Sequence, residues 1–387
     1  MRIGLVVEHL NPYRGGLEHW AWQFVQSMIA RGHELHVLAQ SFSHIDGLPS
    51  LHCHLVPGSY SRMKYAAALE DRLAGLDLDV VHDTGAGWRC DVYQPHFGSR
   101  AALIRRTVDL LPRYLRPVKR LAVHVLPRYR QFAALEARQF VDDGRLFLAL
   151  SHKVAGAFVA NHGVRSGAIR IIPNGVDCER YSPENRKHHR SRVRQELGLE
   201  PGTLLLLMIA HSFRLKGLAP AIQVLAKLRR ETTRVHLAVL GGDSPHRYRL
   251  LARSLGVEES VTFLGSRPGS APFLAAADVL IHPTYYDACS LVVLEALASG
   301  LPVVSTRATG VDELMTDGVE GFLVSEPAET AAMAAHVSSL LDPSLREQMG
   351  RAARRLALQH PFSRCCDAIE AVYCEVVSRR RRTGRAA

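Results

Sequence analysis

The chain has 387 residues, enough for two domains that each bury a core of their own. Its hydrophobic fraction of 47% and charged fraction of 22% are ordinary for a globular protein, and no apolar run approaches the roughly 20 residues that a membrane-spanning helix needs. The net charge of +11 is concentrated in two segments, 105–130 and 379–385, so it is a local feature and not a general coat.

The first half alternates between strand and helix patterns. Residues 2–7 predict a first strand and not a signal peptide, because the apolar run is short and Glu8 and His9 follow it at once. A helix over 17–30, a strand over 34–39, a helix over 64–73 and a strand over 80–82 are expected next, and Ile171 and Ile172 predict the last strand of this half.

Pro173, Asn174 and Gly175 then supply turn residues, so we expect a first domain over 1–172 and a second over 173–364, with a C-terminal helix of about 365–387 returning to the first. Apolar runs of strand length recur at 204–209, 235–240, 261–263, 279–282 and 302–305. This alternation predicts an α/β fold of two Rossmann-like domains, with parallel sheets covered by helices and ligands in a central cleft beyond the carboxyl ends of the strands.

Metal chemistry has little support in the sequence. The seven cysteines are odd in number and form no Cys-x-x-Cys pair, which indicates a reducing compartment and argues against a zinc module. His52 and His54, on either side of Cys53, lack the spacing of a known site, so no metal site is predicted.

The most specific pattern lies at 282–303, where a strand, a loop and a helix that ends near Gly300 follow one another. Asp287 lies in the loop, and Glu295 is expected about two turns inside the helix on its pocket-facing side. Two such acceptors could hold the hydroxyl groups of one extended ligand, a sugar and a ribose, while the helix N-terminus favours a diphosphate. The alternative is a surface acid and a partly buried acid on an ordinary βα unit.

Two further segments are suited to phosphate. Gly15 and Gly16 follow the first strand and let backbone N–H groups approach a phosphate closely, although a tight turn would explain them as well. Arg214 and Lys216 place two cations beside a strand end, where they could stabilise a departing diphosphate or be solvated.

Taken together, these motifs resemble the family 4 glycosyltransferases of the GT-B fold. Segment 282–303 is similar to the E-x7-E region, with Asp287 in place of the first Glu. Segments 15–18, 172–177 and 213–217 match the Gly-Gly loop, the domain-crossing segment and the basic phosphate loop in the same order, and 91–96 with the basic insert after it resembles the lipopolysaccharide core glucosyltransferase I group.

The resemblance implies a retaining hexosyltransferase that uses a nucleotide diphosphate sugar, with UDP-glucose expected, and a glycolipid or lipopolysaccharide-type acceptor. Glu295 would bind the ribose and Asp287 the donor hexose, and His96 would lie near the reacting carbon. The family often has Arg where His211 stands, and Arg214 would supply that charge. Because cations would stabilise the leaving group, neither a metal nor another cofactor is expected.

Other functions stay open beside this one. An epimerase of the same fold and a non-catalytic partner protein are the alternatives, and a phosphorylase lacks a motif for its pyridoxal phosphate lysine. Mannose, galactose and an N-acetylated sugar remain alternatives to glucose.

The basic segment 105–130 holds eight Lys or Arg and one Asp among aliphatic and aromatic residues, and its three prolines should break it into short helices. This composition suits an anionic membrane surface, so Arg113, Arg116, Lys119 and Arg120 are predicted to face the inner side of the cytoplasmic membrane. A solvated charged face is the alternative. Nucleic acid is not expected, because no recognised motif supports it.

Overall fold

The structure is a computed structural model that describes residues 1–45, 47–59, 61–232 and 234–382. The chain divides into two compact units, residues 1–173 with 363–387, and residues 174–362. The chain therefore leaves the first unit after Pro173 and returns to it at Ser363, so the last helix belongs with the N-terminal unit.

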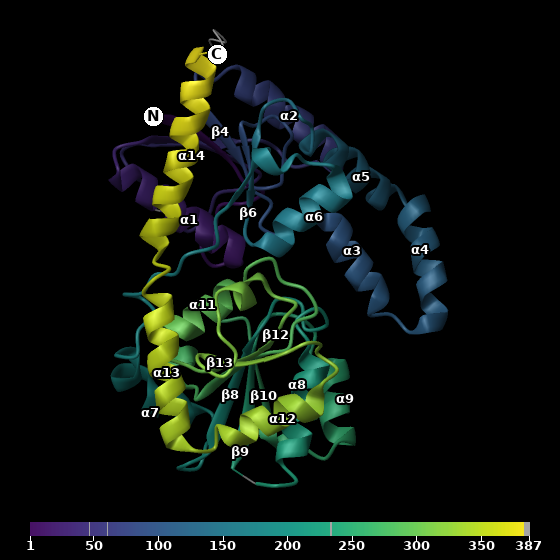
Figure 1. Cartoon of the computed structure of the whole chain (residues 1–387), viewed down its shortest axis with the longest axis vertical. Helices are drawn as coiled ribbons and strands as arrows, with labels where there is room; N and C mark the ends of the chain where they lie inside the picture. The colour runs from purple at the N-terminus through teal and green to yellow at the C-terminus, as the bar shows by residue number, and fades with distance from the viewer. Residues whose placement is uncertain (46, 60, 233, 383–387) are drawn as a thin grey trace. The chain divides into compact units, whose positions relative to one another are not determined.

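The described residues of the first unit form a seven-stranded sheet in which all neighbouring strands are parallel (Figure 1). In spatial order the strands are β3 (Leu51–Leu55), β2 (Glu34–Ala39), β1 (Arg2–Val6), β4 (Val80–Asp83), β5 (Val92–Tyr93), β6 (Leu146–Ala149) and β7 (Ile169–Ile171). The helices of this unit are α1 (Gly16–Ala30), α2 (Arg62–Ala74), α3 (Arg100–Asp109), the 3-10 turn η1 (Arg113–Leu115), α4 (Arg116–Val125), α5 (Pro127–Gln139), α6 (His152–His162), the turn η2 (Ser166–Ala168) and α14 (Phe362–Arg382).

Helix α14 is fastened to the first unit by side-chain contacts along its length. The Tyr373 hydroxyl lies 2.6 Å from Nδ1 of the buried His82 on β4. Arg31 pairs with Asp367 and Glu370 near the start of the helix, and Arg170 pairs with Glu375 further along. These pairs join segments up to 339 residues apart in the chain and explain why the terminal helix packs with the N-terminal sheet.

The second unit has a six-stranded parallel sheet in its described residues. In spatial order its strands are β10 (Val261–Gly265), β9 (Val235–Leu240), β8 (Leu204–Ile209), β11 (Val279–His282), β12 (Val303–Thr306) and β13 (Gly321–Val324). Its helices are α7 (Asn185–Glu196), α8 (Leu218–Leu228), α9 (His246–Ser254), η3 (Glu258–Ser260), α10 (Ala271–Ala276), α11 (Leu291–Ala298), η4 (Gly310–Glu313), α12 (Thr330–Ser339) and α13 (Pro343–Ala357).

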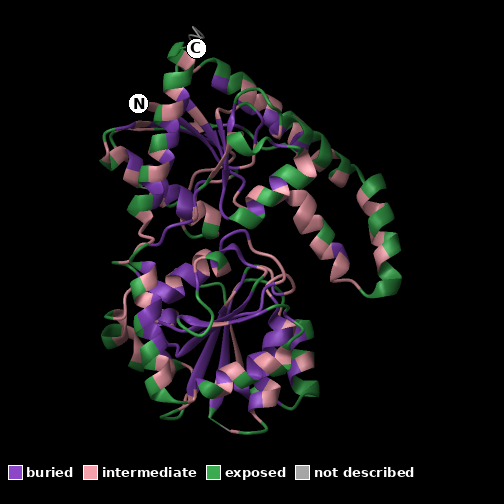
Figure 2. Cartoon of the chain, in the orientation of Figure 1, coloured by how far each residue is buried: buried purple, intermediate pink, exposed green. Residues whose placement is uncertain are grey.

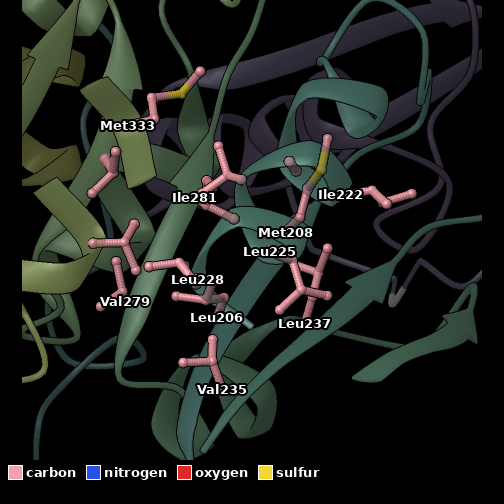
Figure 3. Close-up of a cluster of buried hydrophobic side chains, with 14 of the residues drawn as sticks. Leu206, Met208, Ile222, Leu225, Leu228, Val235, Leu237, Val279, Ile281 and Met333 are labelled. Atoms are coloured by element: carbon pink, nitrogen blue, oxygen red, sulfur yellow. The ribbon is translucent and has the colours of Figure 1, made fainter. Parts of the chain in front are cut away.

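The core of the second unit follows from the apolar strand sequences. Strand β8 reads LLLLMI and is buried along nearly all its length, as expected for a parallel strand covered on both faces (Figure 2). Leu206 and Met208 pack with Leu225 of α8 and Met333 of α12 in one buried cluster (Figure 3). Each such side chain stabilises the fold by roughly 1.5–3 kcal/mol through burial, which holds the strand ends in fixed positions.

The predicted α/β fold with two Rossmann-like units is confirmed, while some element predictions are wrong. The sequence reading omitted β3, β5, β6 and β13, and it extended β7 to Ile172, where the strand ends at Ile171. Glu295 is the fifth residue of α11 and so lies little more than one turn inside the helix, not two.

The basic insert forms a helical excursion from the first unit. Pro117 and Pro127 lie in the first turns of α4 and α5, where a missing N–H costs nothing, so the prolines set where these helices begin. Helix α4 lies at the outer edge of the unit, away from its sheet (Figure 1). Among the residues described, no helix is both long and apolar enough to cross a bilayer.

Candidate active site

The second unit brings two loops together at the carboxyl edge of its sheet. One loop follows β8 and the other follows β11, and the backbone N–H of Tyr285 donates to the carbonyl of Leu215 at 2.9 Å. Gly217 has a φ of +79°, and a Cβ added there would lie 1.8 Å from the carbonyl oxygen of Pro283. Only glycine therefore allows this approach, which places Lys216 beside the loop that carries Asp287.

Lys216 and Asp287 form an ion pair within this edge. The Lys216 Nζ lies 2.5 Å from Asp287 Oδ2 and 3.3 Å from the carbonyl oxygen of Tyr286. Nε2 of the buried His282 lies 3.4 Å from the same carboxylate oxygen. Burial acts to raise the pKa of Asp287, but the charge of Lys216 and the contacts with His282 together outweigh it and hold the pKa below its ordinary value. Asp287 is therefore an ionised acceptor at neutral pH.

Glu295 has the opposite environment. Ser270 Oγ donates to its Oε2 at 2.7 Å, and the Tyr181 hydroxyl lies 3.1 Å from the same Ser270 oxygen. Burial raises the pKa of Glu295 from 4.5 to about 7, although Ser270, Tyr181 and Arg180 act to lower it. The carboxyl group is thus poised between its neutral and ionised forms at neutral pH.

The start of α11 lies between these two carboxylates in the sequence. Ser290 is its N-cap, with Oγ accepting from the backbone N–H of Val293 at 3.4 Å. The Asn174 side chain donates to the carbonyl of Cys289 at 2.8 Å and so fixes the loop before the helix. A buried helix start held in this way presents backbone N–H groups and a positive dipole end to an anion.

In the first unit, the predicted glycine loop follows β1, and His96 lies on the segment that follows β5, two strands along the sheet. Gly15 caps α1 with φ −170°, an extended backbone that any residue adopts, so only the missing side chains of Gly15 and Gly16 distinguish this loop. The His96 ring lies 4.2 Å from the ring of Trp20 on α1. Burial, and then the nearby His82, lower the pKa of His96 to about 3, so its imidazole is neutral at physiological pH.

The other predicted cation, Arg214, lies on the loop after β8 that also carries Lys216. Arg214 is half-buried in the loop after β8, whereas His211 is exposed at the start of that loop. The backbone N–H of Phe213 donates to Asp243 Oδ2 at 2.9 Å, which anchors the loop to the segment after β9. Arg214 therefore lies on the same anchored loop as Lys216.

The four basic residues predicted to face a membrane divide into two pairs. Arg113 and Arg120 are exposed. Arg116 instead donates to the carbonyls of Asp109 and Leu111, at 2.8 and 3.0 Å, and so caps the end of α3. The Lys119 ammonium lies 5.2 Å from the centre of the Tyr129 ring on α5. The second pair holds the excursion together.

An apolar stripe runs along the same excursion. Tyr114, Val118, Leu121 and Val125 follow one another at helical spacing and are 60–77% exposed. A cavity of about 530 Å³ between α3, α4 and α5 is lined by apolar side chains together with Arg105, Arg120, Arg130, His124, Asp109 and Glu136. The excursion therefore combines an exposed apolar face with basic groups, which is typical of helices that lie in a membrane interface.

Both carboxylates are visible in the sequence, but their hydrogen-bond and ion-pair partners are not. Ser270, Tyr181 and His282 had no signal of their own, because their contacts arise from helix packing and strand register. The Lys216–Asp287 pair joins residues 71 positions apart, and both had been assigned to the ligand and not to each other. In the basic tail, Arg380 forms an ion pair with Asp91. Residues 383–387 of the tail lie outside the described part of the chain.

Comparisons with known proteins identify the family to which both units are related. A family model described as Glycosyl transferases group 1 matches residues 189–356, and one described as Glycosyltransferase Family 4 matches residues 14–180. The lipopolysaccharide glucosyltransferase WaaG of Escherichia coli (strain K12) is 29% identical over 322 residues, covering 81% of this chain and 82% of its own. A D-inositol 3-phosphate glycosyltransferase of Acidothermus cellulolyticus is 28% identical over 98% of this chain and 91% of its own.

Solved structures show the same fold. The crystal structure of WaaG superposes with a TM-score of 0.82 at 25% identity, covering 96% of this chain and 99% of that chain. Anabaena Alr3699/HepE, solved in complex with UDP-glucose, superposes with a TM-score of 0.70 at 20% identity, covering 97% and 100%. The two family models leave only residues 181–188 unmatched between positions 14 and 356.

Proposed function

Because this chain belongs to the family 4 glycosyltransferases of the GT-B fold, we propose that it is a retaining hexosyltransferase that transfers glucose from UDP-glucose to a glycolipid or lipopolysaccharide-type acceptor. The observation that carries the proposal is the pair of oppositely tuned carboxylates, Asp287 and Glu295, on either side of the α11 N-terminus at the carboxyl edge of the second sheet.

The donor assignments follow from these contacts. Glu295 would accept hydroxyl groups of the ribose, and Asp287 would accept from the hexose. Lys216 has three N–H donors, of which Asp287 and the Tyr286 carbonyl take two, leaving the third for a phosphate oxygen. Arg214, on the same loop, and the Gly15–Gly16 loop with the start of α1 would complete the diphosphate contacts.

The reaction would use the leaving phosphate as its own base. In this front-face mechanism the acceptor oxygen would bond to the anomeric carbon on the face from which the diphosphate departs, so the hexose keeps its anomeric configuration. The departing diphosphate would accept the proton of the acceptor hydroxyl. Arg214, Lys216 and helix N-termini would stabilise the negative charge of the leaving group, so neither a metal nor another cofactor is needed for this step. His96, neutral at physiological pH, would act by hydrogen bonding to the hexose and not by charge.

The acceptor class is inferred from the relatives and the helical excursion. WaaG acts on lipopolysaccharide by its name, and the exposed stripe on α4 with Arg113 and Arg120 suits an anionic lipid surface. Each basic residue near such a surface contributes about 1 kcal/mol, so the excursion would hold the enzyme transiently on the inner face of the cytoplasmic membrane. A surface-bound acceptor would then be concentrated near the enzyme.

The test is nucleotide release from UDP-, GDP- and ADP-sugars with and without a lipopolysaccharide-type acceptor. We expect UDP release from UDP-glucose that depends on acceptor, and a product with the anomeric configuration of the donor by NMR. An inverted product would refute retention. Conversion into another UDP-sugar without acceptor would identify an epimerase, and donor binding without turnover would identify a non-catalytic partner.

A further inference from the structure

A cluster of potential metal ligands lies on β2 and β3 of the first sheet, on residues to which no donor contact is assigned. His36 Nε2 lies 3.0 Å from Glu34 Oε1, and His52 Nε2 lies 3.1 Å from the same oxygen. The ligating atoms of all three residues lie within 4.8 Å of one another. His36 is buried, Glu34 is half-buried and His52 is exposed, so solvent reaches the cluster from one side.

Sheet register assembles the cluster. Glu34 and His36 are two residues apart on β2 and so point to the same face, and His36 is directly opposite His52 on the parallel strand β3. Cys53 alternates to the other face. The sequence showed no metal-site spacing here, because the ligands come from two strands and meet only through their pairing.

We propose that Glu34, His36 and His52 bind a divalent transition-metal ion, with Zn²⁺ as its occupant and water in the fourth position. Two imidazoles and one carboxylate are a ligand set that suits zinc, whereas Mg²⁺ and Ca²⁺ prefer oxygen ligands alone. Tetrahedral zinc with bonds of about 2.0–2.2 Å separates its ligands by about 3.3 Å. The distances from Glu34 to the two imidazoles, 3.0 and 3.1 Å, are already close to this value.

The groups around the cluster bear on its affinity. The Glu34 carboxylate already faces both imidazoles, at 3.0 and 3.1 Å, so it is placed as a ligand. Arg2 lies 3.9 Å from the other Glu34 oxygen and would repel a cation, but it also pairs with Asp77 at 2.5 Å.

A chain of hydrogen bonds runs from Arg72 through His54 to His36, and metal binding requires the protons in this chain to move. Arg72 Nη2 donates to His54 Nδ1 at 3.0 Å, so neutral His54 carries its proton on Nε2, 3.0 Å from His36 Nδ1. The proton of His36 is then on Nε2, facing Glu34. A metal on Nε2 requires this proton to move to Nδ1 of His36 and the His54 proton to move to its own Nδ1, which keeps the proton count unchanged. Arg72, which is exposed, must then swing away.

The position of the site indicates a structural role. Glu34 is the first residue of β2, so the cluster lies toward the amino ends of the strands, whereas the Gly15 and His96 segments follow their carboxyl ends. Strand β3 is at the edge of the sheet and pairs with β2 alone in the described residues. A metal shared by the two strands would fasten this edge without taking part in glycosyl transfer.

The test is equilibrium dialysis of the full chain, first stripped with chelator, against Zn²⁺, with Mg²⁺ in parallel. We expect one tightly bound Zn²⁺ per chain and no Mg²⁺ at this affinity. His52→Gln and Glu34→Gln should each weaken Zn²⁺ binding at least tenfold, whereas His188→Gln, an exposed histidine on α7, should leave it unchanged. Arg72→Met should tighten binding several-fold, because it removes the competing donor and a positive charge.

Two outcomes would overturn the proposal. Equal Zn²⁺ affinity and stoichiometry in wild type and His52→Gln would show adventitious binding to other histidines. Sulfur in the first coordination shell, by X-ray absorption at the zinc edge, would show binding to a cysteine. His52 is exposed, so its variant should fold, and thermal unfolding without metal checks this directly.

Discussion

Replacing Glu295 with glutamine should stabilise the protein at alkaline pH and change it little at acidic pH. Burial raises the pKa of Glu295 to about 7 in the folded chain, from an ordinary 4.5. Below pH 4.5 the carboxyl group is protonated in both the folded and unfolded states, so its ionisation does not lower the free energy of unfolding there. Between pH 4.5 and 7 the unfolded state loses the proton first, so stability falls as pH rises; above pH 7 the loss is constant.

The magnitude follows from the two pKa values. A difference from 4.5 to about 7, at about 1.36 kcal/mol for each pH unit, gives a cost of about 3 kcal/mol above pH 7. Glutamine is uncharged at every pH and can still accept the hydrogen bond from Ser270 Oγ. The variant should therefore gain stability relative to wild type by up to about 3 kcal/mol at pH 8.5 and by close to nothing at pH 4.5.

The assay is urea unfolding of wild type and Glu295→Gln from pH 4.5 to 9, at constant salt. Glu259→Gln, on the exposed turn η3, is the matched control and should differ from wild type by no more than about 0.5 kcal/mol. A stability difference between wild type and Glu295→Gln that stays constant with pH would refute the reasoning, because it would show that the buried carboxyl does not titrate differently on folding.

The same group should couple donor binding to pH. If ribose hydroxyls donate to the ionised carboxylate, UDP-glucose binding favours that form and releases a proton near pH 7. Donor affinity of wild type should rise from pH 6 to 8, while Glu295→Gln loses this dependence and binds about 10- to 100-fold more weakly at pH 8, as expected for losing hydrogen bonds to a charged group worth about 1.5–3 kcal/mol. Calorimetry in buffers of different ionisation enthalpy measures the proton directly.

Three further outcomes are expected. Lys216→Met should weaken UDP binding at least tenfold in a thermal-shift titration, and an unchanged midpoint shift at saturating UDP would contradict its phosphate role. His96→Ala should keep donor affinity within a few fold but lower kcat strongly; turnover near wild type would make His96 a bystander. Val118→Ser with Leu121→Ser should abolish sedimentation with anionic vesicles at low salt and leave neutral vesicles unbound, whereas equal sedimentation of wild type and variant would make the stripe on α4 an ordinary solvated face.

The sequence predicts the fold well where strands are long and buried on both faces. The apolar runs at 204–209 and 235–240 coincide with β8 and β9, because a short continuous apolar segment bounded by turn residues is typical of a parallel strand buried on both faces. It fails at β5, which has only two residues, and at β3, where His52 and His54 interrupt an edge strand. Whether these segments form strands depends on how they pair and on their place in the sheet. Neither property leaves a pattern in the local sequence.

The candidate site divides in the same way. Asp287 and Glu295 are visible as a spacing, but their ionisation is set by residues remote in sequence. Lys216 reaches Asp287 only because Gly217 packs against Pro283, and Ser270 reaches Glu295 from a loop 25 positions earlier. Packing therefore determines the chemistry that the motif can perform, and a motif match alone gives residue types without their charge states.

Two carboxylates in similar positions are made different by what surrounds them. Asp287 faces an ammonium and stays ionised, so it can accept hydrogen bonds at every pH where the enzyme works. Glu295 instead has the Ser270 and Tyr181 hydroxyl groups beside it, and burial keeps it near half-protonated at pH 7 until a ligand supplies further donors. Once a ligand ionises Glu295, both carboxylates are negative, and the Lys216 ammonium beside Asp287 offsets part of that charge. Binding and ionisation at Glu295 then become one event, which is how a buried acid can contribute to affinity without a metal beside it.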